Sequence, residues 1–337
     1  MSSIKKIATT SLFVAFASAA LAQYSSPELM LVTDAGNGSS LHPAQVERYD
    51  PYSGAYLGAF GAGYLSDPYG ATVIGSDAYI TDLFSVGSTF YSRIVKFNFS
   101  TGAYDGTVFN SGPDQLTQIT SYGGNLIASD LGSGSGNGRV WTLSPTGQFI
   151  QATSLPTASD ALWGGAVVGA QYWGADENVS TLGGALLVYN LNADGSVSNF
   201  EGYIDYGLVF TSITTSQVNG SNFVYGSAVD QANNVEYLKK YDTSGNVVGS
   251  YQFGAGQASW SLAAGHNGII YDFNRQGTVY RFDGGDSLSF GPLGSFALTN
   301  TYSGNTIAVY AAPEPVSMAF LGLGVIGLVL KRRRGRS

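Results

Sequence analysis

A repeat of about 46 residues is the feature that most constrains the fold of this chain. Six times, an apolar stretch leads to a polar turn containing glycine and then to a second apolar stretch. The anchors of these copies are 41 to 52 residues apart: Tyr49, Phe97, Leu143, Tyr189, Tyr241 and Phe282. A second series, of aspartates at or near the end of short apolar runs, has spacings of 42 to 54 residues: Asp34, Asp82, Asp130, Asp176, Asp230 and Asp272. Two landmarks with nearly the same period indicate a repeat architecture.

Each copy reads as a β-hairpin because hydrophobic alternation flanks an Asp/Ser/Asn-Gly turn. The hairpins cover residues 46–60, 94–109, 140–152, 186–200, 238–251 and 279–290. A further apolar run precedes each of the last five aspartates, for example residues 71–75 and 116–120. Four strands in about 46 residues match one blade of a β-propeller. The sequence therefore predicts an all-β body, residues 23–311, with six blades and almost no helix.

Both ends of the body favour ring closure. Residues 297–311 look like residues 116–130, which read as the first two strands of a blade, whereas the body starts at Leu29 with a strand of the second type. We expect one blade to be completed from both ends, which would remove exposed sheet edges. The surplus strand at one end leaves a seven-bladed propeller as an alternative. The competing architecture is a β-sandwich or two jelly rolls, but no composition shift divides residues 24–310.

By its period, the body resembles propellers of the NHL or gluconolactonase-like kind. The resemblance rests on no diagnostic motif, because WD dipeptides and kelch double glycines at regular positions are not evident. It implies the propeller fold.

The amino terminus has the arrangement of a secretory signal peptide. Lys5 and Lys6 precede an uncharged stretch, residues 7–21, and a small-x-small site at Ala20 to Ala22. We expect signal peptidase to remove residues 1–22 before Gln23. A retained transmembrane helix is the alternative, which the shortness of the stretch disfavours.

The carboxyl terminus, residues 312–337, contains an ordered set of signals. Pro313, Glu314 and Pro315 precede an uncharged stretch from Val316 to Leu330. As a helix, its fifteen residues would cover roughly 22 Å, a short transmembrane segment. A basic block follows: Lys331, Arg332, Arg333 and Arg334. The positive-inside rule would keep this block in the cytoplasm and the body outside.

These parts, in this order, resemble the PEP-CTERM sorting signal of exopolysaccharide-forming Gram-negative bacteria. The resemblance covers only the tail. It implies that the protein is held transiently in the inner membrane, that an exosortase removes the tail near Pro313 to Pro315, and that the body then reaches the cell surface or extracellular matrix. An ordinary membrane anchor is the alternative.

The body is acidic and contains no cysteine. Residues 23–312 hold eight basic and 22 acidic side chains, which gives a net charge of −14, against −8 for the whole chain. Nucleic acid is an unfavourable partner for such a body, because phosphate binding needs clustered Lys and Arg. Without cysteine, neither disulfides nor a thiolate site can form.

Several residues could carry chemistry, and each has a competing structural interpretation. The six aspartates could hold Ca²⁺ or another divalent cation, but a residue that recurs once per blade more often caps the following turn. His42 and His266 lie in separate polar loops. The glycine-rich residues 131–139 lack the end of a phosphate loop. The tryptophans could stack on sugars or fill the core: Trp141, Trp163, Trp173 and Trp260.

The sequence therefore favours an exported, non-catalytic binding or scaffold protein, with extracellular polysaccharide as an expected partner. The alternative is a metal-dependent, lactonase-like hydrolase or lyase in the periplasm or outside the cell, with a cation held by some of the six aspartates. The sequence itself discloses no ligand, reaction or catalytic residue.

Overall fold

A computed structural model describes residues 28–132, 138–156, 161–177, 183–254, 259–265, 268–274, 276–285, 288, 291–301 and 303–311. The chain divides into two units, residues 29–310 and the two ends, residues 1–28 with 311–337. The expected signal peptide and all parts of the expected sorting signal lie outside the described residues. Within the described part of the chain, no helix is long and apolar enough to cross a membrane.

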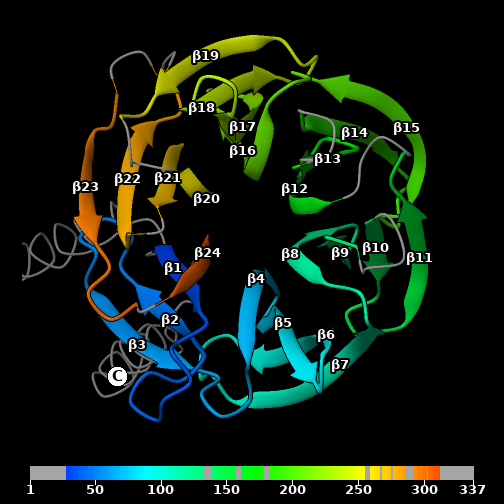
Figure 1. The fold of residues 1–337 in the computed structure, drawn as a ribbon, viewed down its shortest axis with the longest axis vertical. Helices are drawn as coiled ribbons and strands as arrows, with labels where there is room; N and C mark the ends of the chain where they lie inside the picture. The colour runs from blue at the N-terminus through cyan, green and yellow to red at the C-terminus, as the bar shows by residue number, and fades with distance from the viewer. Residues whose placement is uncertain are drawn as a thin grey trace, which may run out of the picture. The chain divides into compact units, whose positions relative to one another are not determined.

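The described residues form six four-stranded sheets around a central axis (Figure 1). Five sheets use consecutive strands. The first is β4 (Asp67–Ile74), β5 (Asp77–Val86), β6 (Thr89–Asn98) and β7 (Tyr104–Gly112). The second is β8 (Leu116–Tyr122), β9 (Asn125–Asp130), β10 (Arg139–Leu143) and β11 (Phe149–Ser154). The third is β12 (Leu162–Val168), β13 (Gln171–Asp176), β14 (Ala185–Leu191) and β15 (Val197–Ile204).

The fourth sheet is β16 (Val209–Val218), β17 (Ser221–Asp230), β18 (Val235–Asp242) and β19 (Val247–Gln252). The fifth is β20 (Ser259–Ala264), β21 (Ile269–Asn274), β22 (Thr278–Asp283) and β23 (Gly294–Ala297). The sixth joins both ends of the body, in the spatial order β24 (Gly304–Ala311), β1 (Glu28–Asp34), β2 (Gln45–Tyr49) and β3 (Tyr56–Phe60). The innermost strands are β4, β8, β12, β16, β20 and β24 (Figure 1). This is a six-bladed β-propeller without a helix in its described residues, as the repeat predicts, and the sandwich alternative is wrong.

Asp and Asn side chains form the turns that lead to the outermost strands. Asp50 Oδ1 accepts hydrogen bonds from the backbone N–H groups of Tyr52 and Ser53 at 2.8 and 3.0 Å. Gly54 then turns the chain at φ +72°, where a β-carbon would be strained and would also meet the ring of Phe296. The polar turn therefore sets where the second strand of the hairpin begins.

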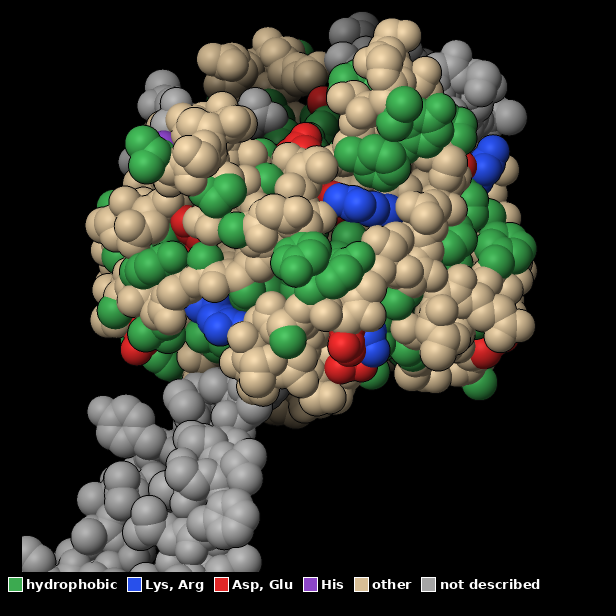
Figure 2. Space-filling model, turned by 90° about the horizontal axis from the view of Figure 1, so that it is seen from below, with side chains coloured by type: hydrophobic (Ala, Val, Ile, Leu, Met, Phe, Trp, Pro, Cys, Tyr) green, Lys and Arg blue, Asp and Glu red, His purple; other side chains and the backbone are tan. Residues whose placement is uncertain are grey.

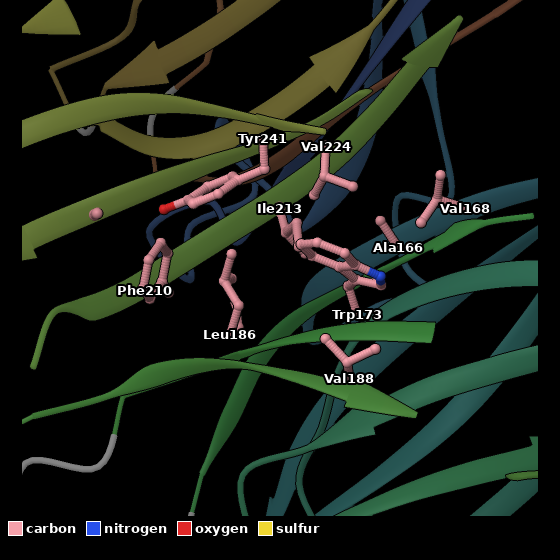
Figure 3. Packing of buried hydrophobic residues seen from close by; sticks show 11 residues of the cluster. Ala166, Val168, Trp173, Leu186, Val188, Phe210, Ile213, Val224 and Tyr241 are labelled. Atoms are coloured by element: carbon pink, nitrogen blue, oxygen red, sulfur yellow. The ribbon is translucent and has the colours of Figure 1, made fainter. Parts of the chain in front are cut away.

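Apolar side chains fill the space between neighbouring sheets. Figure 3 shows the cluster between the third and fourth sheets, in which Trp173 of β13 packs with Phe210 of β16 and Tyr241 of β18. All three are fully buried. Burying a large apolar side chain contributes roughly 1.5–3 kcal/mol, so the sheets are held together mainly by such clusters.

The ring is closed by β24, which pairs with β1. The backbone N–H of Ser303 donates to Asp34 Oδ1 at 2.7 Å, and the N–H of Ala35 donates to the carbonyl of Ser303 at 3.0 Å. The Thr301 hydroxyl donates to the buried carboxylate of Glu47 on β2. Burial raises the pKa of Glu47, and the side-chain hydrogen bonds that this carboxylate accepts, including the one from Thr301, partly offset the rise. Closure from both ends agrees with the sequence prediction and resolves the blade count as six.

Two boundary predictions are wrong at this end of the body. Residues 297–311 do not form the first two strands of a blade, because Ala297 ends the outermost strand β23 and only β24 follows. In the sixth predicted hairpin, residues 279–290, the first strand pairs instead with residues 294–297. The apolar residues after Asp283 resemble a strand by composition, but the outer strand starts only at Gly294.

A hydroxyl group links the sheets at each of the six junctions of the ring. In each case a Thr or Ser side chain bonds the backbone of an innermost strand in a neighbouring sheet. At five junctions the hydroxyl donates to a backbone carbonyl. The donor and acceptor residues are Thr33 and Tyr69 (2.7 Å), Thr81 and Thr117, Thr117 and Leu162 (2.8 Å), Thr215 and Val167 (3.1 Å), and Ser227 and Ser259 (3.1 Å). At the sixth junction, the N–H of Ile307 donates to the Ser261 hydroxyl at 3.0 Å.

We expect Thr81→Val to lower the free energy of unfolding. The buried Thr81 hydroxyl accepts from the N–H of Gly70 at 2.7 Å and donates to the carbonyl of Thr117, and valine can do neither. Leaving buried backbone groups unpaired costs about 1–3 kcal/mol, measurable as a lower urea midpoint. Thr107→Val, at an exposed position on β7 of the same sheet, is the matched control. Equal midpoints for the two variants would contradict the linking role.

Candidate functional site: the central channel

The innermost strands enclose a channel cavity of about 390 Å³. All six strands contribute to its wall. The lining residues are Ala71, residues 118–121, residues 165–167, Gly169, residues 213–215, residues 262–264 and residues 307–310. A cavity of this size lies within the range of small-molecule sites.

The channel wall is polar but uncharged. Its polar side chains are Gln118, Thr120, Ser121, Thr214, Thr215 and Tyr310. Several are held by the backbone: the Tyr310 hydroxyl donates to the Ala71 carbonyl at 2.9 Å, and Gln118 Oε1 accepts from the N–H of Gly165 at 3.2 Å. Burial raises the pKa of Tyr310 to about 12, so its hydroxyl stays neutral. Among the described lining residues there is no Asp, Glu, Lys, Arg or His.

Aromatic rings narrow the channel toward the N-terminal ends of the same strands. There a second cavity measures only about 10 Å³, roughly the room for one water molecule. The rings of Trp163 and Trp260 meet edge to face with centroids 5.4 Å apart, and Tyr69 lies 6.5 Å from Trp163. The channel thus has a wide, hydroxyl-rich part and a narrow, aromatic part.

Three of the six predicted aspartates cap chain turns, as the structural interpretation expects. Asp34, Asp82 and Asp130 are buried at or near the ends of the strands that follow the innermost ones along each sheet. Their Oδ1 atoms each accept two backbone N–H bonds at 2.7–3.0 Å, from Gly36 and Ser303, from Ser66 and Asp67, and from Gln115 and Gly132, respectively. One donor or more in each pair lies just before or at the start of an innermost strand. The aspartates therefore fix where those strands begin.

The other three aspartates differ from one another. Asp176 is buried at the end of β13, paired in register with Leu162. Asp230 is more exposed and accepts the N–H of Asn233 at 3.1 Å. None of the six aspartates lines the channel cavity. Within the described residues, no three His, Cys, Asp or Glu side chains lie close enough together to hold a metal ion.

Asp272 does not occupy the position that the spacing predicts. The strand-end position of β21 is held by Asn274, which pairs with Ser259 at the start of β20. Asn274 Oδ1 accepts the N–H groups of Gln276 and Thr278 at 3.1 and 2.8 Å. Asp272 lies two residues earlier, so the sequence series assigned the capping role to the wrong residue in this blade.

The carboxyl group of Asp272 is fully buried next to two other oxygen-bearing side chains. Its pKa is raised to about 8, mainly by burial; the Ser259 side chain acts to lower this pKa, and the nearby Glu236 carboxylate contributes to the rise. Both Asp272 oxygens, Glu236 Oε2 and Ser259 Oγ are buried without a hydrogen-bond partner. With no exposed surface, Asp272 cannot reach a substrate in the channel.

The histidines, the glycine-rich loop and the tryptophans that the sequence offers as candidates lie in different parts of the molecule. His42 lies exposed in the loop between β1 and β2, whereas His266 lies outside the described residues, as does much of the glycine-rich loop at 131–139. Trp141 and Trp173 are core residues. Of the four tryptophans, only Trp163 and Trp260 reach the channel. The core interpretation therefore holds for Trp141 and Trp173, and sugar stacking stays a prediction.

The chain matches no family model and no curated protein. Its class is therefore defined by the fold and the channel: a six-bladed β-propeller with an uncharged polar channel that narrows at an aromatic end. The NHL or gluconolactonase-like resemblance stays a prediction.

Sequence reasoning missed the channel residues and the linking hydroxyls. A signal for the latter is present at two junctions, because Thr33 and Thr81 each directly precede a capping aspartate. In a strand, successive side chains point to opposite faces. The aspartate and the hydroxyl can therefore act on different neighbours, and a recurring Thr-Asp pair would have predicted both roles.

We expect Asp130→Asn to destabilise the protein independently of metal. Asp130 Oδ2 accepts the indole N–H of Trp141 at 3.1 Å, and an amide loses this charge-assisted bond or one of the backbone bonds. The cost is about 1–3 kcal/mol, measured by urea unfolding with and without EDTA. Asp230→Asn, at a more exposed position, is the control. A difference between wild type and Asp130→Asn that changes with EDTA would indicate that Asp130 is a metal ligand instead.

Proposed function

We propose that this protein is an exported binding protein of the cell surface or extracellular matrix, which holds a neutral, hydroxyl-rich ligand in its central channel. A unit of an extracellular polysaccharide is the ligand class that fits this chemistry. The protein acts by binding or scaffolding rather than by catalysis.

The uncharged channel wall is the observation that carries the proposal. Its hydroxyl and amide groups can donate and accept hydrogen bonds, which suits sugar hydroxyls. The rings of Trp163 and Trp260 at the narrow end offer apolar faces or edges against which a sugar ring can pack. General acid–base catalysis needs a titratable group within hydrogen-bond reach of the substrate, and the described wall supplies only the weakly acidic Tyr310 hydroxyl.

The two chain ends support the proposed destination. The signal peptide directs export, and the tail that resembles a PEP-CTERM signal directs removal by an exosortase and release from the inner membrane. A polysaccharide ligand and an exopolysaccharide-linked sorting route point to the same compartment.

The destination is tested by intact mass and cell fractionation in the native host with and without its exosortase. We expect the mature protein to lack about 22 residues at the amino end and about 20 to 25 at the carboxyl end, by the cleavage-site pattern and the position of the tripeptide. The body should be found in the matrix fraction. Without the exosortase, or after deletion of residues 313–337, its size and location should change. An unchanged location would overturn the sorting proposal.

The channel is tested by titrating the protein with oligosaccharides from the host polysaccharide, monitored by calorimetry. Ala308→Trp places a large ring in the channel wall and should weaken binding at least tenfold, about 1.4 kcal/mol. Ala103→Trp, at an exposed turn outside the channel, should bind as wild type does. Binding that Ala308→Trp leaves unchanged would place the ligand elsewhere on the molecule.

A further inference from the structure

Asp272 is a buried carboxylate for which the fold has no structural use. In its blade the turn is capped by Asn274, two residues later. The capping aspartates Asp34, Asp82 and Asp130 all accept backbone N–H groups, whereas no backbone N–H group is hydrogen-bonded to either oxygen of Asp272. A buried ion without partners costs several kcal/mol, so this position calls for a compensating group.

Three side chains with buried oxygen atoms are neighbours at the junction between the fourth and fifth sheets. The buried atoms are Oδ1 and Oδ2 of Asp272, Oε2 of Glu236 and Oγ of Ser259. Asp272 and Ser259 belong to the fifth sheet and Glu236 to β18 of the fourth, and β18 and β20 contact each other. Ser259 and Glu236 each affect the pKa of Asp272, as neighbouring groups do.

The surroundings hold Ser259 in place. Its carbonyl accepts the hydroxyls of Thr211 and Ser227 at 3.3 and 3.1 Å. Its backbone N–H lies against the Glu236 carboxylate, whose pKa this contact lowers while burial raises it. Because both of its backbone groups are engaged with the fourth sheet, its side-chain oxygen has a fixed position beside Asp272.

The described basic side chains of the body are bound elsewhere. Arg93, Lys96, Arg139 and Lys239 pair with other aspartates. Arg48, Lys240 and Arg281 donate to backbone carbonyls. None of these seven is hydrogen-bonded to Asp272 or Glu236 in the described residues, and Arg275 lies outside them.

We propose that Asp272, Glu236 and Ser259 form a structural binding site for a hard divalent cation, with Ca²⁺ as the best fit. Carboxylate and hydroxyl oxygens are ligands that Ca²⁺ accepts, and a bidentate carboxylate with added water or backbone oxygens completes its six to eight positions. The cation ties the fourth sheet to the fifth. This site is separate from the channel, so it does not depend on the proposed function.

The burial of the site sets how the cation binds. Since Asp272 has no exposed surface, the cation is taken up as the two sheets assemble, and its binding energy adds to the stability of the folded state.

The test is thermal unfolding of the purified full chain after EDTA treatment and dialysis, with and without 5 mM CaCl₂. We expect calcium to raise the melting temperature of the wild type by roughly 5 °C and elemental analysis to find one Ca²⁺ per chain. Asp272→Asn and Glu236→Gln should abolish both effects, and Asp230→Asn should keep them. In the absence of calcium, Asp272→Asn should be at least as stable as the wild type, because it removes a buried ionisable group without a partner.

Two outcomes would overturn the proposal. One is the absence of bound calcium and of a calcium-dependent shift in the wild type, and the other is an undiminished shift in Asp272→Asn. If Asp272→Asn fails to fold, Ser259→Ala is the second variant, with an expected weakening of calcium affinity by about tenfold. Arg275→Gln tests the competing counter-charge: strong destabilisation by this change, with no calcium response in the wild type, would assign the compensation to Arg275.

Discussion

The inner edge of each sheet is the constraint on which the rest of this structure depends. An innermost strand has a partner on one side only, so its other edge presents N–H and C=O groups toward the channel and the neighbouring sheet. Threonine and serine hydroxyls from adjacent sheets satisfy part of this edge at all six junctions. The same need makes the channel wall polar without making it charged. An uncharged polar channel wall is thus a consequence of how the ring is held together.

No charged side chain is among the described residues of the channel wall. The buried aspartates serve mainly to cap turns and to fix where strands begin. Figure 2 shows few charged side chains, scattered over the face in view. The buried aspartates compensate their burial with backbone N–H groups, an indole or the Arg93 guanidinium, which lies 2.8 Å from Asp82. Against that pattern the junction around Asp272 and Glu236 stands out, because two acids meet there without a described basic partner. The repeat makes the exception visible, since three other blades show a buried aspartate whose carboxylate accepts backbone N–H groups.

The repeat period predicted the four-stranded sheets and favoured six of them with seven left open, and the two ends of the body predicted the closure of the ring. The period failed where one blade departs from the others: the last interval is shorter, Asn274 takes the capping position, and the outer strand β23 begins late at Gly294. The channel could not be read from alternation, because the pairing of innermost strands is interrupted by register shifts, such as those between Pro68 and Ala71 and between Leu116 and Ile119. A shift of this kind reverses which side chains face the axis. Apolar runs such as residues 116–120 therefore indicate a strand without indicating its channel side.

The closing strand has a consequence for when the protein can fold. Residues 304–311 complete a sheet that begins at residue 28, so contacts essential to the ring span almost the entire body. Folds with such distant contacts form slowly. The ring also cannot be completed until its final strand has been synthesised. The sheet that holds β1, β2 and β3 must wait, with one edge open, for the last strand of the body, and until that moment its unpaired edge can pair with other chains.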